Sequence, residues 1–263
     1  MNKTLLYLNE DLASSIALRY ADYLASVSDL KLYIIHVEEP DLRQQAGTGW
    51  VRRTWETGVQ ETGTQVVKRI IKTENVKCRF AGPPRILVGE REYEILKELR
   101  IGGYDLFIEG HMDASSPSDF YKIVSSRLYK HAPCPILLVK NLTVSTTAAI
   151  LLGDDVDHRK VVDRYQKLIH GSKLDTELIY FKFREQAEIS FMDPSEGGVA
   201  LKESEELLKA AGMPVKNSTV ICGTPEQTGD FLRNYAFVAA NFPVRKCLRM
   251  EVLGNTPASV LLC

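Results

Sequence analysis

The sequence predicts two α/β domains in tandem, each a five-stranded parallel sheet with helices on both faces. Apolar runs of strand length alternate with amphipathic helical segments along all 263 residues, and this alternation favours parallel strands joined by right-handed crossovers. The chain is long enough for two domains of about 130 residues. In addition, one closing pattern occurs twice, at Val124–Lys140 and at Leu248–Cys263: a helix, a Pro-containing turn and a short apolar strand.

The two copies of the closing pattern align residue by residue. Pro133 falls opposite Pro257, and Leu137–Val139 falls opposite Leu261–Cys263. A repeat of half the chain indicates two similar domains, because solenoid repeats are only about 20–50 residues long. We therefore expect one domain at residues 1–141 and a second at residues 148–263. The polar segment Asn141–Thr147 is the predicted linker.

In the first half, each element follows from apolar spacing and from the residues that flank it. Strand-length apolar runs occur at Thr4–Leu8, Leu30–Val37, Val76–Ala81, Tyr104–Glu109 and Ile136–Val139. Helical spacing predicts helices at Leu12–Val27, Val51–Thr73, Gly89–Ile101 and Asp119–His131. Gly102 and Gly103 are the stop signal of the third helix, since glycine readily takes the left-handed conformation that ends a helix.

The second half repeats this order of elements. The predicted strands are Ala149–Leu152, Thr176–Phe183, Ser218–Cys222, Tyr235–Ala240 and Val260–Leu262. The predicted helices are Asp157–Ile169, Glu196–Ala211, a short helix from Thr224, and Val244–Leu253. The short helix has a strong start signal, because Thr224 is a capping residue, Pro225 suits the first helical position and Gln227 completes a capping box.

Composition excludes several classes of function. Hydrophobic residues make up 44% and charged residues 25% of the chain, as in ordinary globular proteins. A formal net charge of -1 provides no basic surface for nucleic acid. No apolar run is long enough to span a membrane, and the N-terminus lacks a signal-peptide layout. The five cysteines are scattered without a C-x-x-C spacing, which favours reduced thiols. We expect a cytoplasmic protein.

Three segments of the first half carry a family resemblance: HAPCPILLV at 131–139, YDLFIEG at 104–110 and IIHV at 34–37. With them the chain resembles the universal stress protein family in a tandem arrangement. In the second half the likeness rests on element order, on Ile150–Asp155 and on Leu253–Cys263. The resemblance implies flavodoxin-like or adenine-nucleotide-hydrolase-like domains that form an intramolecular pseudo-dimer through their last strands. A homodimer of the whole chain is left open, and the protein partner is unknown.

The resemblance also implies a nucleotide site, from which this sequence departs. Many members of the family bind ATP or AMP through an Asp after the first strand and a G-x2-G-x9-G-[S/T] loop after the fourth. The glycines let backbone N–H groups approach the phosphates. Here Asn9 replaces the Asp, and only Gly110 keeps its glycine position. Asp113 and Lys122 fall at the other two, and a carboxylate from Asp113 repels phosphate.

The second half keeps only part of that motif. Asp154 retains the acidic position after the first strand, but Asn241-Phe242-Pro243 leads almost directly into the last predicted helix, so the phosphate loop is expected to be deleted. We therefore expect no cofactor, with ATP or AMP as the alternative. The vestigial nucleotide-binding residues predicted by the resemblance are Asn9, Val88, Gly110, His111, Ser125 and Asp154.

Other chemistry-bearing residues have structural explanations. His36 lies on a buried strand and is expected in the core. His158 ends an acidic cluster, Asp154–His158, which suits helix capping better than a divalent metal. Cys134 and Cys263 flank or end apolar strands, where packing is favoured over catalysis. The sequence contains no G-x-S-x-G nucleophile motif and no P-loop.

These observations lead to three functional hypotheses. The first is a non-enzymatic cytoplasmic universal stress protein that acts in the stress response through protein or small-ligand interaction, without tight ATP binding. The second is an ATP- or AMP-binding sensor, or weak ATPase, with a rearranged site in the first half around Asn9, Val88, Gly110, His111 and Ser125. The third, a small-molecule enzyme, uses the acidic cluster of the second half.

Overall fold

The computed structural model describes residues 1–39, 50–112, 116–242 and 245–263. The first half contains five strands in the order β3-β2-β1-β4-β5, and every neighbouring pair among them is parallel. These strands are β1 (Asn2–Tyr7), β2 (Leu30–Glu38), β3 (Arg85–Val88), β4 (Leu106–Gly110) and β5 (Ile136–Val139). The predicted parallel arrangement of this half is confirmed.

The second half repeats this order and adds one strand. Its strands follow the order β11-β10-β6-β7-β9-β8. They are β6 (Thr147–Leu152), β7 (Asp175–Phe183), β8 (Ser190–Met192), β9 (Val215–Gly223), β10 (Phe237–Ala240) and β11 (Ser259–Leu262). The additional strand, β8, runs antiparallel to β9 at the edge of the sheet. The α/β class is confirmed, and within the described residues the strand count of the second half is corrected from five to six.

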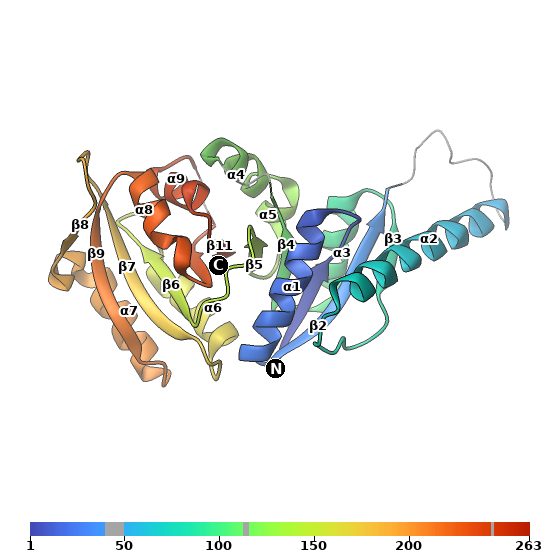
Figure 1. The fold of residues 1–263 in the computed structure, drawn as a ribbon, viewed down its shortest axis with the longest axis horizontal. Helices are drawn as coiled ribbons and strands as arrows, with labels where there is room; N and C mark the ends of the chain where they lie inside the picture. The colour runs from blue at the N-terminus through green and yellow to red at the C-terminus, as the bar shows by residue number, and fades with distance from the viewer. Residues whose placement is uncertain (40–49, 113–115, 243–244) are drawn as a thin grey trace.

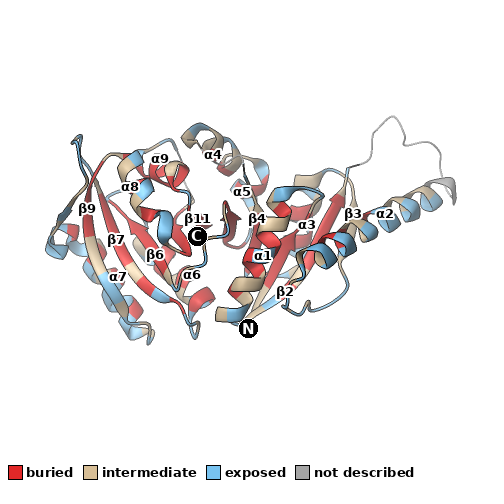
Figure 2. Cartoon of the chain, viewed as in Figure 1, coloured by how far each residue is buried: buried red, intermediate tan, exposed pale blue. Residues whose placement is uncertain are grey.

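Helices cover both faces of the sheet, as the sequence predicts (Figure 1). One face carries α1 (Leu12–Val27), α2 (Trp50–Glu74), α6 (His158–Ile169) and α7 (Gly198–Ala210). The other carries α3 (Arg91–Gly102), α4 (Pro117–Val124), α5 (Arg127–His131), α8 (Pro225–Phe231) and α9 (Leu248–Asn255). Figure 2 shows the buried strands between these layers. Within the described ranges, no helix is long and apolar enough to cross a membrane.

The two halves join edge to edge through their last strands. β5 and β11 pair antiparallel, and Leu137 lies directly opposite Leu261. These two leucines are also equivalent in the internal repeat, so the pairing is symmetric about them, as in an isologous dimer contact. The predicted pairing of these strands is confirmed, and it makes one continuous 11-stranded sheet. Pairing also protects two apolar edges that otherwise favour aggregation.

The third strand of the first half is not where the apolar run predicts it. Val76–Ala81 makes only an isolated bridge, from Phe80 to Leu32, and β3 lies after the two prolines instead. The cause is a tertiary contact, because the backbone N–H groups of Lys77 and Cys78 donate to Asp22 Oδ1 of α1 at 3.0 and 2.6 Å. That contact ties the start of this segment to a helix instead of the sheet.

Two predicted helices are also corrected. The segment 119–131 is two helices, since Ser126 adopts an extended conformation and begins α5. Serine competes for backbone hydrogen bonds and favours such helix ends. The last helix begins at Leu248 and not at Val244, and residues 243–244 lie outside the described chain. The described residues 245–247 just before this helix are not helical.

Candidate functional site

Four of the five nucleotide-site residues predicted in the first half lie at the carboxyl ends of its strands, and those that follow the neighbouring strands β1 and β4 lie close together. Asn9 follows β1, while Gly110 ends β4 and His111 follows it. Val88 ends β3, and β2 and β1 stand between it and Gly110, a separation of about 14 Å at the usual strand spacing. Ser125 ends α4, where its N–H donates to the Tyr121 carbonyl at 3.0 Å. Asp113 lies outside the described residues.

Gly110 has a packing role at this edge. A Cβ at this position would overlap the carbonyl oxygen of Ala13, in the first turn of α1. The adjacent N–H of His111 is committed to the Val139 carbonyl at 2.9 Å. The glycine therefore allows β4 to approach α1, with the partly negative carbonyl oxygen of Ala13 directly beside it.

A buried charge network lies beside Gly110. Glu109 is fully buried and forms an ion pair with Arg91 at the start of α3. His111 Nε2 lies 3.1 Å from Glu109 Oε1. Arg91 also stacks 4.4 Å from the ring centre of Tyr7. Burial alone raises the pKa of Glu109, but the charges of Arg91 and His111 outweigh burial and lower it to about 2.

The charges of this network are paired with one another, but Glu109 Oε1, His111 Nε2 and the Tyr129 hydroxyl are buried without a hydrogen-bond partner among the described residues. Tyr129 completes the network, and burial together with the nearby Glu109 charge raises the pKa of its hydroxyl well above the usual value. Arg91 is engaged by Glu109, so it has no free charge to offer a phosphate. Sequence reasoning missed this arrangement. The available signal was a Glu within the apolar strand 104–110, because a buried carboxylate requires a cationic partner.

In the second half, an open cavity of about 690 Å³ lies at the carboxyl edge of the sheet. Its wall comes from the ends of β6 and β7 and from the loop before α9. The lining residues are Gly153, Asp154, Asp155, Phe181, Lys182, Phe183, Arg245, Lys246, Cys247, Leu248 and Arg249. Ligands of open α/β sheets bind at this edge. Of the residues predicted for the nucleotide site, Asp154 lines this cavity.

Both carboxylates of the cavity already have partners. Asp154 accepts a hydrogen bond from the Tyr180 hydroxyl. Asp155 accepts from Arg249 Nε at 3.1 Å and from Nη2 at 3.4 Å. Burial raises the pKa of Asp155, but the hydrogen bond and charge of Arg249 outweigh burial and lower it. Asp155 therefore stays ionised and holds the guanidinium in place.

The other candidate residues have structural roles. His36 is buried, and its ring nitrogens lie 2.8 Å from the Leu8 carbonyl and 3.0 Å from Glu38 Oε1. Asp157 caps α6, and His158 pairs with Glu203 at 2.9 Å. The capping interpretation of the acidic cluster is confirmed at Asp157. Among the described residues, no group of three or more His, Cys, Asp or Glu side chains is arranged to hold a metal ion.

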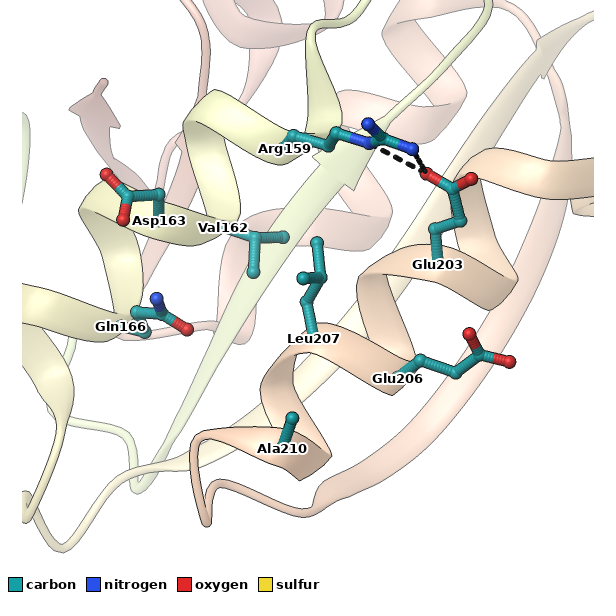
Figure 3. Close-up of a pocket in the computed structure, with 8 residues that line it drawn as sticks. All are labelled: Arg159, Val162, Asp163, Gln166, Glu203, Glu206, Leu207 and Ala210. Carbon is teal, nitrogen blue, oxygen red and sulfur yellow. Dashed lines mark hydrogen bonds and ion pairs between the residues drawn. The ribbon is translucent and has the colours of Figure 1, made fainter.

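A second concavity, of about 640 Å³, is a surface groove between α6 and α7. Figure 3 shows Val162 and Leu207 facing each other across it, with the Arg159–Glu203 ion pair at one end. The groove lies on the face of the sheet and not at the carboxyl ends of the strands. Its lining is aliphatic with charged margins, which is common between two surface helices.

Comparison with known proteins places the fold. No protein-family model matches the sequence, and no curated protein matches it. Three solved structures cover the whole chain. A universal stress protein from Archaeoglobus fulgidus is 16% identical, with 96% of that chain covered and a TM-score of 0.60. A putative universal stress protein from Pseudomonas aeruginosa is 14% identical, with 92% covered and a TM-score of 0.56. A functionally unknown protein from Pseudomonas aeruginosa is 13% identical, with 92% covered and a TM-score of 0.54.

These structures match the chain from end to end, so the likeness includes both halves and their junction. The identities are too low to carry binding properties from one protein to the other. The chain therefore has the fold of tandem universal stress proteins over its full length.

Proposed function

We propose that this protein is a non-enzymatic, cytoplasmic universal stress protein that acts in the stress response by binding a protein or a small ligand, without holding ATP tightly. The fold supports the class of protein. The observation that carries the proposal is the contact of Gly110 with the Ala13 carbonyl. This contact places a partly negative oxygen beside the glycine that begins the related phosphate-binding motif.

Electrostatics supports the same proposal. A phosphate at the first-half edge meets the Ala13 carbonyl and the buried carboxylate of Glu109, whose countercharge Arg91 is already paired. Because Glu109 and Arg91 neutralise each other, this pair offers an incoming phosphate no net positive charge. Among its described residues, the site therefore gives a triphosphate little positive charge to bind.

A non-enzymatic role is supported by the state of the buried thiols. Burial raises the pKa of the Cys134 and Cys263 thiols to about 12. Both are protonated at neutral pH, whereas a nucleophilic cysteine acts as the thiolate.

The test is thermal unfolding of the full chain with about 1 mM ATP and magnesium. We expect the melting temperature to rise by less than about 1 °C. A ligand at about 100 times its Kd adds about 2.7 kcal/mol and several degrees. A shift of that size, or stoichiometric nucleotide released by heating the purified protein, would favour the alternative ATP- or AMP-binding sensor and contradict this proposal.

A further inference from the structure

We propose that the groove between α6 and α7 binds an amphipathic helix of another protein, one whose apolar stripe is flanked by lysine or arginine. The inference rests on the proposed function in one respect, since it names the class of protein partner through which the chain acts. The groove lies between two helices that cover one face of the sheet in the second half, away from the carboxyl ends of the strands.

The shape of the groove suits a helix. Each of the two helices contributes four lining residues with the spacing i, i+3, i+4 and i+7 (Figure 3): Arg159, Val162, Asp163 and Gln166 from α6, and Glu203, Glu206, Leu207 and Ala210 from α7. This spacing marks one face of each helix over two turns, a length of about 11 Å at 1.5 Å per residue. A partner helix lies along such a groove and contacts it with side chains at the same spacing.

The floor of the groove is apolar and partly exposed. Val162 and Leu207 face each other across it (Figure 3), and Leu207 is 39% exposed. Val199, four positions before Glu203, continues the same face of α7 and is 69% exposed. A partner that covers these side chains removes apolar surface from water, which favours association.

The charges of the groove favour a basic partner. The lining carries one cation, Arg159, and three carboxylates, Asp163, Glu203 and Glu206, so its net charge is -2. Arg159 is already paired with Glu203 at 2.9 Å. Figure 3 shows Asp163 on the side of α6 that faces away from Leu207, and Glu206 on the far side of α7. Acidic side chains therefore flank the apolar floor on both sides.

Both flanking carboxylates are available to a cation of a partner. Glu206 is exposed, and no ion pair or hydrogen bond joins its side chain to another described residue. Asp163 pairs with Lys167 of the same helix at 2.7 Å, but the two side chains are 50% and 69% exposed. Exposed ion pairs of this kind contribute little stability, so Asp163 can exchange its partner readily.

The equivalent helix pair of the first half is bridged differently. Two ion pairs join α1 and the residue before its cap to α2, namely Arg19–Glu74 and Glu10–Arg69. Between α6 and α7, the ion pairs among described residues both use Glu203, at one end of the groove. The rest of the groove has no ion pair across it within the described chain, so its acidic margins are left for a partner.

The partner is another protein and not a second copy of this chain. A symmetric contact between two copies would place this acidic lining against itself, and like charges across an interface repel. A basic amphipathic helix complements the lining instead. The contact covers about two turns of each helix, which is small for a protein interface, so we expect a transient complex.

The experiment measures binding of a fluorescent helical peptide to the full chain by anisotropy. The probe is a capped peptide of about 18 residues, long enough to be helical in water, with Leu at i, i+3, i+4 and i+7 spacing and Lys on both sides. One control peptide has Glu in place of every Lys, and another has the same composition with its Leu residues scattered around the helix. We expect the Lys peptide to bind at least about tenfold more tightly than either control, with an affinity that falls as salt is added.

Variants then locate the binding. Asp163→Lys/Glu206→Lys reverses both flanking charges and is expected to weaken binding of the Lys peptide about tenfold and to strengthen binding of the Glu peptide. The matched control, Glu205→Lys/Glu226→Lys, changes the net charge equally at exposed residues outside the lining and is expected to leave both affinities nearly unchanged. Leu207→Ser reduces the apolar floor without a change of charge, and it decides alone if the charge-reversed variant fails to fold.

Three results would overturn this proposal and leave the proposed function intact. The first is no saturable binding of the Lys peptide up to about 1 mM, or unchanged binding in the groove variants. The second is equal binding of the peptide with scattered Leu residues. The third is dimerisation of the full chain that Leu207→Ser abolishes, which would assign the groove to a second copy. Tight ATP binding, in contrast, contradicts the proposed function and not the groove, so the two ideas fail on different measurements.

Discussion

Two buried ionisable residues show how single side chains stabilise this molecule. Glu109 is neutralised by Arg91 within the first half. Lys140, directly after β5, donates from Nζ to the carbonyls of Leu253, Gly254 and Thr256 at 2.7, 3.2 and 3.0 Å. Those carbonyls belong to the C-terminal end of α9, where a cation is favoured. Lys140 therefore links the first half to the second by capping a helix.

The low pKa of Glu109 predicts a defined pH dependence of stability. Its pKa is lowered from 4.5 to about 2 in the folded chain, so its contribution is complete above about pH 4.5 and is lost as the pH falls toward 2. Glu109→Gln leaves the partly buried Arg91 without its carboxylate partner and should lower the free energy of unfolding by about 3–5 kcal/mol at pH 7. Denaturant titrations from pH 7 to 3 should show that the gap between the two proteins narrows below pH 4.5. A gap that is independent of pH would contradict the network.

Gly254 predicts a second residue-scale effect, at the contact of α4 with α9. A Cβ there would lie 2.5 Å from Pro117 Cα, and a backbone atom cannot move aside alone. Gly254→Ala should therefore destabilise the protein by about 1–3 kcal/mol through overpacking. The matched control is Gly58→Ala in α2, where no atom lies within 4 Å and helix propensity favours Ala by about 1 kcal/mol. Chemical denaturation checks both, and equal effects of the two substitutions would refute the close approach.

At the scale of elements, the pairing of β5 with β11 holds the halves together. Both strands are fully buried along their described length. The two halves are also joined by a helix contact, between α4 and α9. The strand pairing and the helix contact therefore both hold the two halves together.

Deleting Val260–Cys263 tests the pairing of β5 with β11. The deletion removes three large aliphatic side chains, each worth about 1.5–3 kcal/mol when buried, together with the ladder hydrogen bonds to β5 and β10. The loss approaches the stability of a typical domain, about 5–15 kcal/mol. We expect an insoluble or partly unfolded second half and association through the exposed β5 edge, measured by light scattering and circular dichroism. A monomer that melts within a few degrees of the full chain would show that the pairing is dispensable.

For the whole molecule, the continuous sheet predicts cooperative unfolding. Each face of the sheet has one apolar core, and each core contains residues from both halves. The two tryptophans, Trp50 and Trp55, lie in the first half, so their fluorescence reports that half, whereas far-ultraviolet circular dichroism reports both. We expect the two denaturation curves to coincide. Separate midpoints would mean that the halves unfold independently despite the shared cores.

The sequence by itself determined the features that depend on local pattern. Continuous apolar runs identified most strands because buried parallel strands are apolar on both faces. Thr224, Pro225 and Gln227 identified the capping box of α8, which the structure contains. The repeated closing segments identified the strands that pair at the junction, since equivalent edges are self-complementary. For the candidate sites, the sequence indicated that the motif was altered and placed Asp154 directly after a strand, at the carboxyl edge of the sheet.

Only the tertiary structure decided the features that depend on contacts between distant residues. Asp22 captures the backbone of Cys78, 56 positions later, and displaces the predicted third strand. Arg249 donates a hydrogen bond to Asp155, 94 positions earlier, and both residues line a charged cavity that no local sequence motif predicts. The reason is physical. The spacing of apolar residues indicates whether a residue is buried. The partner that neutralises a buried charge or accepts a backbone hydrogen bond depends on how distant segments pack.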